Sequence, residues 1–302
     1  MLQRRIFQAF FYSLRSAERL VPPSMLASII WPAVVVFALG RSLGKAGRMW
    51  RLNFAAVFGR PPGLMPILRS FVGETYARLA TLWPDRFMTP AWRSRFMVTG
   101  LDDLQACHAA GKPVVLAVIH AQPLNLLRLF LRANGLPVAT LTFAQGVTGK
   151  RRLINAALDR SSSLAGVPHK FPLSQLRSAY AFLRSGNCLL IACDKQSDDA
   201  VALPTNLGVA RIHVGPFRLA GLVNASVVPA VCWQVAPWRF RIALGKPMMA
   251  PASDSDLAAF MPLAQHCLAT WQPLIQRHPE QLHFNRGAWS GAPQPAPAGR
   301  PS

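Results

Sequence analysis

Residues 111–127 read GKPVVLAVIHAQPLNLL. Within them the run Val114–Ile119 is apolar and rich in β-branched side chains, which indicates a strand buried on both faces. Pro123 suits the first position of a helix, and Asn134-Gly135 gives that helix a stop. The stretch therefore predicts a strand, a turn and a helix, with His120 at the carboxyl end of the strand.

Strands and helices are predicted to alternate beyond this unit. Residues 41–100 are expected to be mainly helical, and a short helix over 101–110 precedes the strand at 114–119. After that strand we expect helices over 123–133, 151–160, 175–184 and 216–223, and strands over 138–143, 188–193, 226–234 and 240–244. This alternation predicts an α/β sheet covered by helices, without internal repeats.

His120 is predicted to lie where open α/β sheets bind ligands, in the crevice outside the carboxyl ends of the strands. Asn125 falls in the first turn of the next helix, so its side chain can accept a hydrogen bond from one ring nitrogen of His120. The other nitrogen would then act as a base, beside helix N–H groups that can steady an oxyanion or a phosphate. The set suits acyl transfer from a thioester to a hydroxyl, but a histidine satisfied at a strand end without chemistry fits the local pattern too.

The N-terminus has the features of a membrane element. Residues 3–21 place apolar side chains at helical spacing with arginines around them, which suits a helix lying in a headgroup layer. Residues 25–40 carry no charge but are shorter than the roughly 20 residues of a spanning helix, and Pro32 interrupts them. We expect an anchor, either spanning or re-entrant; a buried helix pair and a signal peptide cleaved near Ala38-Leu39-Gly40 are the alternatives.

The net charge of +21, from 33 Lys and Arg against 12 Asp and Glu, implies an anionic partner. The aromatic residues stand mostly in apolar company, which favours a membrane or a phosphate-bearing lipid over nucleic acid. The high apolar content, 51%, also points to lipid. Five cysteines at spacings that fit neither zinc nor a disulfide framework are expected to be small buried thiols.

Several common motifs are absent from the sequence. It contains no G-x-x-x-x-G-K-[ST], no G-x-G-x-x-G and no G-x-S-x-G, so neither a phosphate loop nor a serine-hydrolase elbow is expected. His266, His278 and His283 lack an acidic cluster nearby in the sequence and are assigned to surface or packing.

Four stretches resemble the bacterial lipid A late acyltransferases, the lauroyl and myristoyl transferases within the lysophospholipid acyltransferase superfamily. They are GKPVVLAVIHAQPLN, like the strand before His-x4-Glu or His-x4-Asp; NCLLIACDKQ, with Asp-x-Gln; LGVARIHVGPFRLAGLVNASVVPAVCWQ; and TWQPLIQRHPEQLHFNRGAW, with Pro-Glu-Gln. Their order and spacing agree with the family from about residue 25 to residue 289.

The resemblance implies a glycerol-3-phosphate acyltransferase-like α/β fold, with a mixed central sheet flanked by helices and an N-terminal helical membrane anchor. It implies an inner-membrane enzyme with its catalytic domain facing the cytoplasm. Such an enzyme moves a fatty acyl group from acyl carrier protein or acyl-CoA to a hydroxyl of a lipid A precursor or related anionic glycolipid. Neither a metal, a cofactor nor a nucleic-acid partner is implied.

Carried over residue by residue, His120 takes the place of the catalytic base and Asn125 that of its acidic partner. Asp194 and Gln196 match the Asp-x-Gln pair, and Arg160 aligns loosely with a basic residue used for substrate phosphate. These three are therefore expected to bind substrate.

Basic residues of a predicted helix are expected to add to the substrate-binding surface. A cationic rim that attracts an acidic carrier protein or a phosphorylated lipid can be formed by Lys150, Arg151 and Arg152, with Arg128, Arg132, Arg160 and Lys170.

Asn125 departs from the family pattern, because an amide can orient an imidazole but carries no charge. In serine proteases an Asp-to-Asn change at the comparable place costs about 10⁴-fold, whereas cysteine proteases use a natural Asn. Pro123-Leu124 also replaces the family's Asn-Trp. The change is compatible with a slower enzyme, with a partner elsewhere such as Asp194, or with a catalytically impaired family member that acts as a membrane lipid-binding or complex-forming protein.

We expect three parts along the chain. Residues 1–48 are predicted to form amphipathic and membrane-anchoring helices, residues 49–289 the acyltransferase domain, and residues 290–302, rich in Gly, Pro and Ala, a disordered tail.

Overall fold

The structure, a computed structural model, describes residues 21–58, 61–80, 89–121, 123–142, 168, 170–195, 197–283 and 289–290. The helix predicted over 151–160 lies outside these residues, as do almost all of the helix predicted over 3–21 and of the tail predicted over 290–302.

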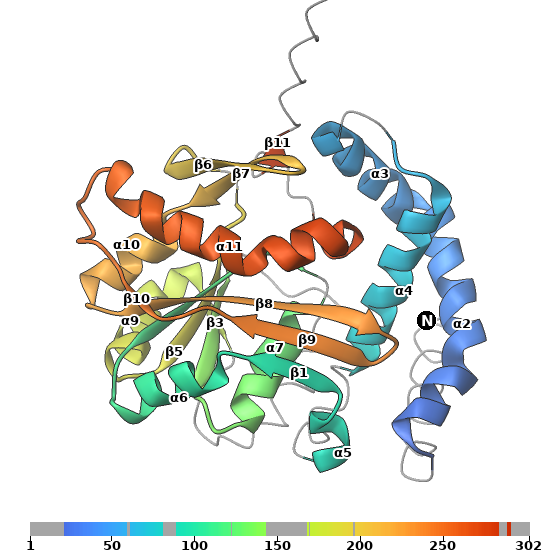
Figure 1. Cartoon of the computed structure of the whole chain (residues 1–302), viewed down its shortest axis with the longest axis horizontal. Helices are drawn as coiled ribbons and strands as arrows, with labels where there is room; N and C mark the ends of the chain where they lie inside the picture. Colours follow the sequence, from blue (N-terminus) through green and yellow to red (C-terminus); the bar gives the residue numbers. More distant parts are fainter. Residues whose placement is uncertain are drawn as a thin grey trace, which may run out of the picture.

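An eight-stranded sheet forms the centre of the described chain, in the order β1-β9-β8-β2-β5-β3-β4 with β10 beside β8 (Figure 1). The strands are β1 (Phe96–Thr99), β2 (Val114–Val118), β3 (Val138–Thr142), β4 (Lys170–Pro172), β5 (Cys188–Ala192), β8 (Ser226–Ala236), β9 (Arg239–Leu244) and β10 (Met248–Met249). Strands β4, β3, β5, β2 and β8 run parallel, whereas β9 runs antiparallel to β8 and carries β1 parallel to itself. The sheet is mixed, as predicted.

Helices flank this sheet (Figure 1). They are α2 (Pro23–Leu43), α3 (Lys45–Phe58), α4 (Leu64–Ala80), α5 (Pro90–Arg93), α6 (Leu101–Ala109), α7 (Leu124–Ala133), α9 (Leu176–Arg184), α10 (Gly215–Leu222) and α11 (Met261–Arg277). Single 3-10 turns are η2 (Leu173–Gln175), η3 (Ala258–Phe260) and η4 (Pro279–Gln281). A second, antiparallel sheet, which the sequence did not predict, is formed by β6 (Ala200–Thr205), β7 (Gly208–His213) and β11 (Trp289–Ser290).

Strand β2 is buried on both faces, which confirms the prediction from its apolar run. Val115 and Ala117 face a core that includes residues of α9, α10 and α11. Val114, Leu116 and Val118 face a second core with α7 and with residues of α2 and α4. The two cores fix β2 in the middle of the molecule, so the residues that follow it have a firm support.

Helix α2 is one continuous helix from Pro23 to Leu43, although Pro32 lies inside it. It packs along α4, where Tyr76 Oη donates to the carbonyl of Ala27 at 2.9 Å and Arg41 forms an ion pair with Glu74 at 2.6 Å. Met25–Leu43 is long and apolar enough to cross a membrane, by length and composition alone. Residue 48, the predicted end of the anchor, lies inside α3.

All five cysteines are free thiols, and four of them are buried: Cys188, Cys193, Cys232 and Cys267. Burial raises the pKa of Cys188 to about 12 and keeps the pKa values of the other three buried thiols well above the ordinary range. These four confirm the predicted small buried thiols, whereas Cys107 on α6 is partly exposed.

Candidate active site

His120 follows the last residues of β2, at the carboxyl edge of the parallel strands, as predicted. The chain after α11 closes over this strand end: the backbone N–H of His283 donates to the carbonyl of His120 at 2.8 Å, and Ala121 pairs with Leu282. The chain that follows the Pro-Glu-Gln segment, Pro279–Gln281, therefore lies against the histidine turn.

Asp194 lies opposite His120 because their strands are parallel neighbours. Val118 of β2 pairs with Ala192 of β5, and each functional residue comes two positions later. The ring Nδ1 of His120 lies 2.7 Å from Oδ1 of Asp194, and the backbone N–H of His120 donates to Oδ2 at 3.0 Å. The side chain of Asp194 is 5% exposed and that of His120 is 43% exposed, so the carboxylate lies inside and the ring at the surface.

This geometry sets the protonation of the ring. A carboxylate only accepts hydrogen bonds, so Nδ1 carries the proton that lies between the two groups, and Nε2 of the neutral ring is the basic nitrogen. Burial alone lowers the pKa of His120, but the hydrogen bond and the negative charge of Asp194 raise it by more, and the net pKa lies above the ordinary 6.5. The pair thus forms a base that is strengthened by a buried carboxylate.

Asn125 does not take the place predicted for it. Nδ1 of His120 is bound to Asp194, and Asn125 is exposed on the first turn of α7, without a hydrogen bond to His120 among those of the described residues. The helix begins at Leu124, with Pro123 as its N-cap residue, and the side chain at 125 belongs to the solvent side of the turn. The predicted contact is corrected to Asp194; a catalytic role of Asn125 stays a prediction.

Most of the other predicted binding residues lie outside the described chain, namely Lys150, Arg151, Arg152, Arg160 and Gln196. Of the predicted cationic rim, Arg128 and Arg132 are buried rather than exposed. Arg128 donates to Thr140 Oγ1 at 3.3 Å and Arg132 to the carbonyl of Val138 at 3.0 Å. These two arginines connect α7 to β3, and the helix that carries them is buried from Leu126 to Ala133.

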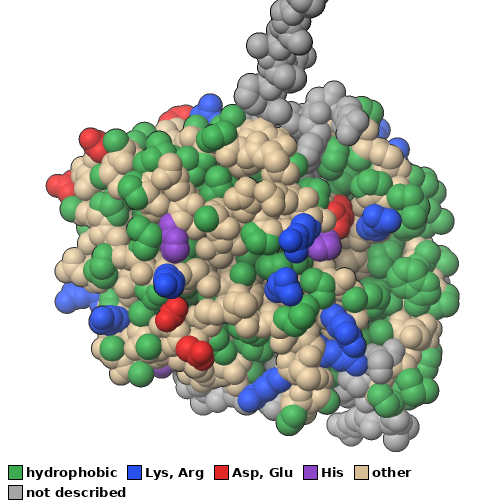
Figure 2. All heavy atoms as spheres, in the orientation of Figure 1, with side chains coloured by type: hydrophobic (Ala, Val, Ile, Leu, Met, Phe, Trp, Pro, Cys, Tyr) green, Lys and Arg blue, Asp and Glu red, His purple; other side chains and the backbone are tan. Residues whose placement is uncertain are grey.

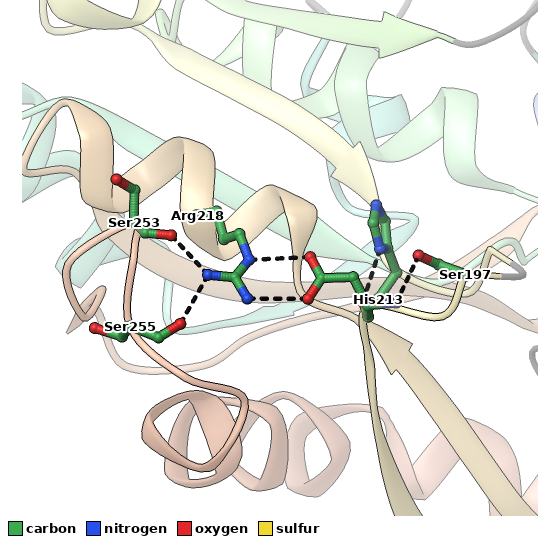
Figure 3. A network of polar contacts seen from close by, with 6 residues as sticks. Ser197, His213, Arg218, Ser253 and Ser255 are labelled. Atoms are coloured by element: carbon green, nitrogen blue, oxygen red, sulfur yellow. Dashed lines mark hydrogen bonds and ion pairs between the residues drawn. The ribbon is translucent and has the colours of Figure 1, made fainter.

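A polar network that the sequence did not predict holds the loop after Asp194 (Figure 3). The guanidinium of Arg218, on α10, makes two bonds of 3.0 Å to the carboxylate of Asp199. It also donates to the carbonyls of Ser253 at 2.7 Å and Ser255 at 2.8 Å, and it lies over the Phe260 ring. In the sequence, the signal for this network was the single charged residue, Arg218, in the otherwise apolar stretch GPFRLAGL of residues 215–222.

The backbone of the same loop is fixed at both ends. The N–H of Cys193 donates to the carbonyl of Val118 at 2.7 Å, and the N–H of His213 donates to the carbonyl of Cys193 at 2.8 Å. At the other end the carbonyl of Asp199 accepts from the N–H of Val214 at 3.1 Å and contacts Nδ1 of His213 at 3.1 Å. Asp194 is therefore supported on both sides along the chain.

A small cavity of about 10 Å³ lies behind Asp194, between β7 and α11. Its lining is mainly apolar and includes Ile119, Cys193, Ile212, Leu268, Trp271 and Trp289. Space for about one water molecule is far too little for a fatty acyl chain. The cavity belongs to the support of Asp194 rather than to substrate.

Metal ligands do not gather in the described part of the chain, where no group of three or more His, Cys, Asp or Glu could hold an ion. His266 Nε2 lies 2.8 Å from the carbonyl of Lys246, and His278 Nδ1 lies 3.5 Å from Glu280. Both contacts fit the predicted packing and surface roles.

The fold and the site define a class of protein: an α/β domain that holds a histidine–carboxylate pair at the carboxyl edge of its parallel strands, where open α/β sheets bind ligands. No family model matches the sequence. The chain is 25% identical over 260 residues to the phosphatidylinositol mannoside acyltransferase of Mycobacterium tuberculosis (strain CDC 1551 / Oshkosh), covering 79% of this chain and 76% of that protein. The similarity supports the predicted class of enzyme, an acyltransferase acting on lipid, and does not single out lipid A enzymes.

Among solved structures the chain is similar to the 1-acyl-sn-glycerophosphate (LPA) acyltransferase PlsC from Thermotoga maritima. The TM-score is 0.39 at 14% sequence identity, and the match covers 76% of this chain and 96% of that chain.

Proposed function

We propose that this protein transfers a fatty acyl group from an acyl thioester to a hydroxyl of a membrane lipid, with His120 as the general base. The observation that carries the proposal is the 2.7 Å contact between Nδ1 of His120 and the buried carboxylate of Asp194. The similarity to a lipid acyltransferase points to the same chemistry.

The reaction needs one proton acceptor that later returns the proton. The acceptor hydroxyl attacks the thioester carbonyl carbon while Nε2 of His120 takes its proton. The tetrahedral intermediate then breaks its carbon–sulfur bond, and the leaving thiolate takes the proton from the imidazolium. The products are an ester and a free thiol, and Asp194 stabilises the imidazolium in between. The positive end of α7, which begins at Leu124, can steady the oxyanion.

The acceptor that we propose is an anionic glycolipid, a lipid A precursor or a related molecule. The net charge of +21 favours a phosphate-bearing partner. The relative's name gives a phosphatidylinositol mannoside as its substrate, which is likewise an anionic glycolipid. We propose acyl carrier protein or acyl-CoA as the donor, and Lys150, Arg151, Arg152, Arg160, Asp194 and Gln196 as residues of the substrate-binding surface.

We further propose that the protein is bound to the inner membrane through α2, with the catalytic domain facing the cytoplasm. The helix packs on α4 by one side and exposes large apolar side chains on the other. A single apolar helix near the N-terminus also fits the core helix of a soluble protein or a signal sequence. Membrane binding explains the exposed apolar side better, because it removes this surface from water.

The test is acyl transfer by the purified protein and its His120→Ala variant, with labelled acyl carrier protein or acyl-CoA and a lipid extract. We expect a new acylated lipid from the parent and none from the variant, because the hydroxyl proton has no acceptor. The half-exposed His266 on α11 offers a matched control, and His266→Ala should keep full transfer. Normal turnover by His120→Ala would overturn the mechanism. Lipid binding by the parent without any transfer would support the catalytically impaired alternative.

A further inference from the structure

A hollow of about 280 Å³ opens between the start of β1 and the turn that joins β8 to β9, far from the residues of the reaction. Ser94, Arg95, Met97 and Arg239 line it. Its volume lies near the lower end of the range for small-molecule sites, roughly 300 Å³. The two arginines among its described lining residues make it a candidate anion site.

Strand pairing places the two arginines together. Phe96 of β1 pairs with Phe240 of β9 in parallel, and the N–H of Phe240 donates to the carbonyl of Arg95 at 2.9 Å. Arg95 and Arg239 each come one residue before a paired phenylalanine, so their side chains meet at the same level of the sheet. The chain enters this arrangement through Trp238, which has a positive φ of 52°.

The two guanidinium groups repel each other. The pKa of Arg95 lies below its usual range, first because the group is partly removed from water and second because of the charge of Arg239. Across the described residues, neither arginine forms an ion pair with a carboxylate. A third arginine, Arg241, follows on β9 and lies over the Trp233 ring. An anion in the hollow would relieve this repulsion.

The hollow adjoins the apolar surface of the N-terminal helices. Trp238 Nε1 donates to the carbonyl of Tyr76 on α4 at 3.1 Å, and the two rings meet edge to face at 5.5 Å. Tyr76 in turn stacks on Trp31 of α2 at 6.4 Å, and Trp31 is half-exposed. Figure 2 shows Lys and Arg side chains over β8, β9 and β1, next to the hydrophobic surface of α2, α3 and α4. Of these three rings Trp31 alone reaches the surface, since Tyr76 and Trp238 are buried. An exposed tryptophan between an apolar surface and basic groups is typical of a membrane interface.

The hollow also faces the same edge of the sheet as His120. Val118 of β2 pairs with Ala230 of β8, and β8 continues six residues further to Ala236, the partner of Arg239. At about 3.3 Å per residue, the turn stands roughly 20 Å beyond the strand end that carries the histidine. A membrane that meets α2 and this turn would lie on the side from which a lipid reaches the site.

We propose that Arg95 and Arg239 bind the phosphate of an anionic phospholipid headgroup in the membrane on which α2 lies. The proposal rests on the proposed membrane binding of α2 and goes beyond the proposed acyl transfer, since headgroup binding needs no turnover. Three observations favour this ligand: the charge of the hollow, the absence among the described residues of a carboxylate ion-paired with either arginine, and the contact of neighbouring Trp238 with Tyr76 of α4, on which Trp31 of α2 stacks.

Vesicle flotation tests the proposal with the full chain. The parent and the Arg95→Gln/Arg239→Gln variant are floated with phosphatidylcholine vesicles, with or without phosphatidylglycerol. Because a basic residue near an anionic surface contributes about 5-fold in binding, we expect the double variant to lose roughly 25-fold on anionic vesicles and little on neutral ones. Inorganic phosphate at constant ionic strength serves as a competitor, and failure to weaken the binding of the parent would mean that vesicle charge alone, not phosphate, is recognised.

The matched control removes the same charge from the opposite edge of the sheet. Lys112 precedes β2 and Arg184 ends α9, and both are exposed. Lys112→Gln/Arg184→Gln should bind anionic vesicles like the parent. Equal losses in the two double variants, or no loss in the arginine variant, would overturn the proposal. His120→Ala should float like the parent, so this inference and the acyltransferase proposal can fail separately.

Discussion

Both carboxylate oxygens of Asp194 are used by one residue, the ring and the backbone N–H of His120. Such a double contact fixes the position of the imidazole and also its tautomer. It supplies the negative charge that the amide of Asn125 cannot, so the departure at position 125 does not leave the histidine without an acidic partner.

Replacing Asp194 by Asn is expected to change the pH dependence of transfer as well as its rate. A general base works when neutral, so activity is lost as the pH falls through the pKa of His120. That pKa lies above 6.5 because of Asp194. Without the negative charge, burial lowers the pKa, and the acidic limb of the rate profile moves to lower pH. The maximal rate should fall by about 10⁴-fold. Initial rates across pH measure both effects.

Asn125 provides the control for this experiment. Asn125→Ala should leave the acidic limb in place, because the side chain is exposed and does not hold the ring. Asn125→Glu should keep or raise transfer. A loss from Asn125→Ala as large as that from Asp194→Asn would restore Asn125 as the catalytic partner.

The sequence located His120 through the buried strand before it and through the family resemblance. It could not establish the contact with Asp194, which lies 74 residues later. That contact depends on β2 and β5 being neighbours in register, and an apolar run does not specify the strand beside it. From the sequence we predicted a hydrogen bond between His120 and Asn125, because the two residues are close along the chain. This prediction was wrong, since the ring contacts Asp194.

At the scale of elements, the Pro-Glu-Gln turn after α11 is tied to β8 by one side chain. Gln281 accepts from the N–H of Gln234 at 2.8 Å and donates to its carbonyl at 2.6 Å, and the residue is buried. The amide takes the place of a neighbouring strand next to the bulge that β8 has between Gln234 and Ala236. The turn is therefore fixed close to the chain that covers His120.

Gln281→Ala should destabilise the fold by about 1–3 kcal/mol, because two buried backbone groups of Gln234 lose their partner. Urea unfolding followed by tryptophan fluorescence measures the change. Gln276→Ala, at an exposed position on α11, should stay within about 0.5 kcal/mol of the parent. Similar small changes in both variants would contradict the structural role of Gln281.

Arg218 is expected to act as a positioning residue for the loop that begins at Asp194. Arg218→Ala should reduce transfer by about 10- to 100-fold, as small displacements of catalytic groups do, and should move the acidic limb toward lower pH. Asp199→Asn should have a similar effect, with little further loss in the double variant, because both changes break the same contact. Arg177→Ala, on the exposed side of α9, is the control. Additive losses would argue against a shared role.

Among the described residues, the strands and helices predicted between residues 101 and 244 end within two residues of the observed bounds. The second sheet was not predicted, because Pro204 lies within β6 and one side of β7 carries Arg211 and His213. Pro32 was expected to interrupt the N-terminal helix. It does not, because α4 supports the helix along its length.

At the scale of the whole molecule, apolar and basic surfaces lie next to each other. The exposed apolar residues of α2 are Met25, Ile29, Trp31, Val36, Phe37, Leu39 and Leu43. The net charge predicted an anionic partner, but only the fold shows that β1 and β9 bring two arginines together near α4, the helix on which α2 packs. The sequence also predicted Arg128 and Arg132 at a cationic surface, but both are buried, so a basic residue in the sequence does not always add charge to the surface.

Val36→Ser/Phe37→Ser should move the protein from the membrane to the soluble fraction. These side chains are 70% and 53% exposed, so the fold should tolerate the change. The loss of apolar contact with lipid should weaken membrane partitioning by about 10- to 100-fold. Leu222 and Met249 are similarly exposed elsewhere, and Leu222→Ser/Met249→Ser is the control. Equal membrane fractions for the parent and the α2 variant would refute membrane binding through this helix.

The distribution of thiols allows the folded protein to be labelled at one position. Cys107 is partly open, and its carbonyl accepts from the N–H of Lys112, just before β2 begins, at the edge away from His120. Because the other four thiols are enclosed, a maleimide dye should attach to the folded chain once, and four more times only after denaturation. The same attachment point would let the protein be tethered to a solid support with its reactive edge turned toward the solution.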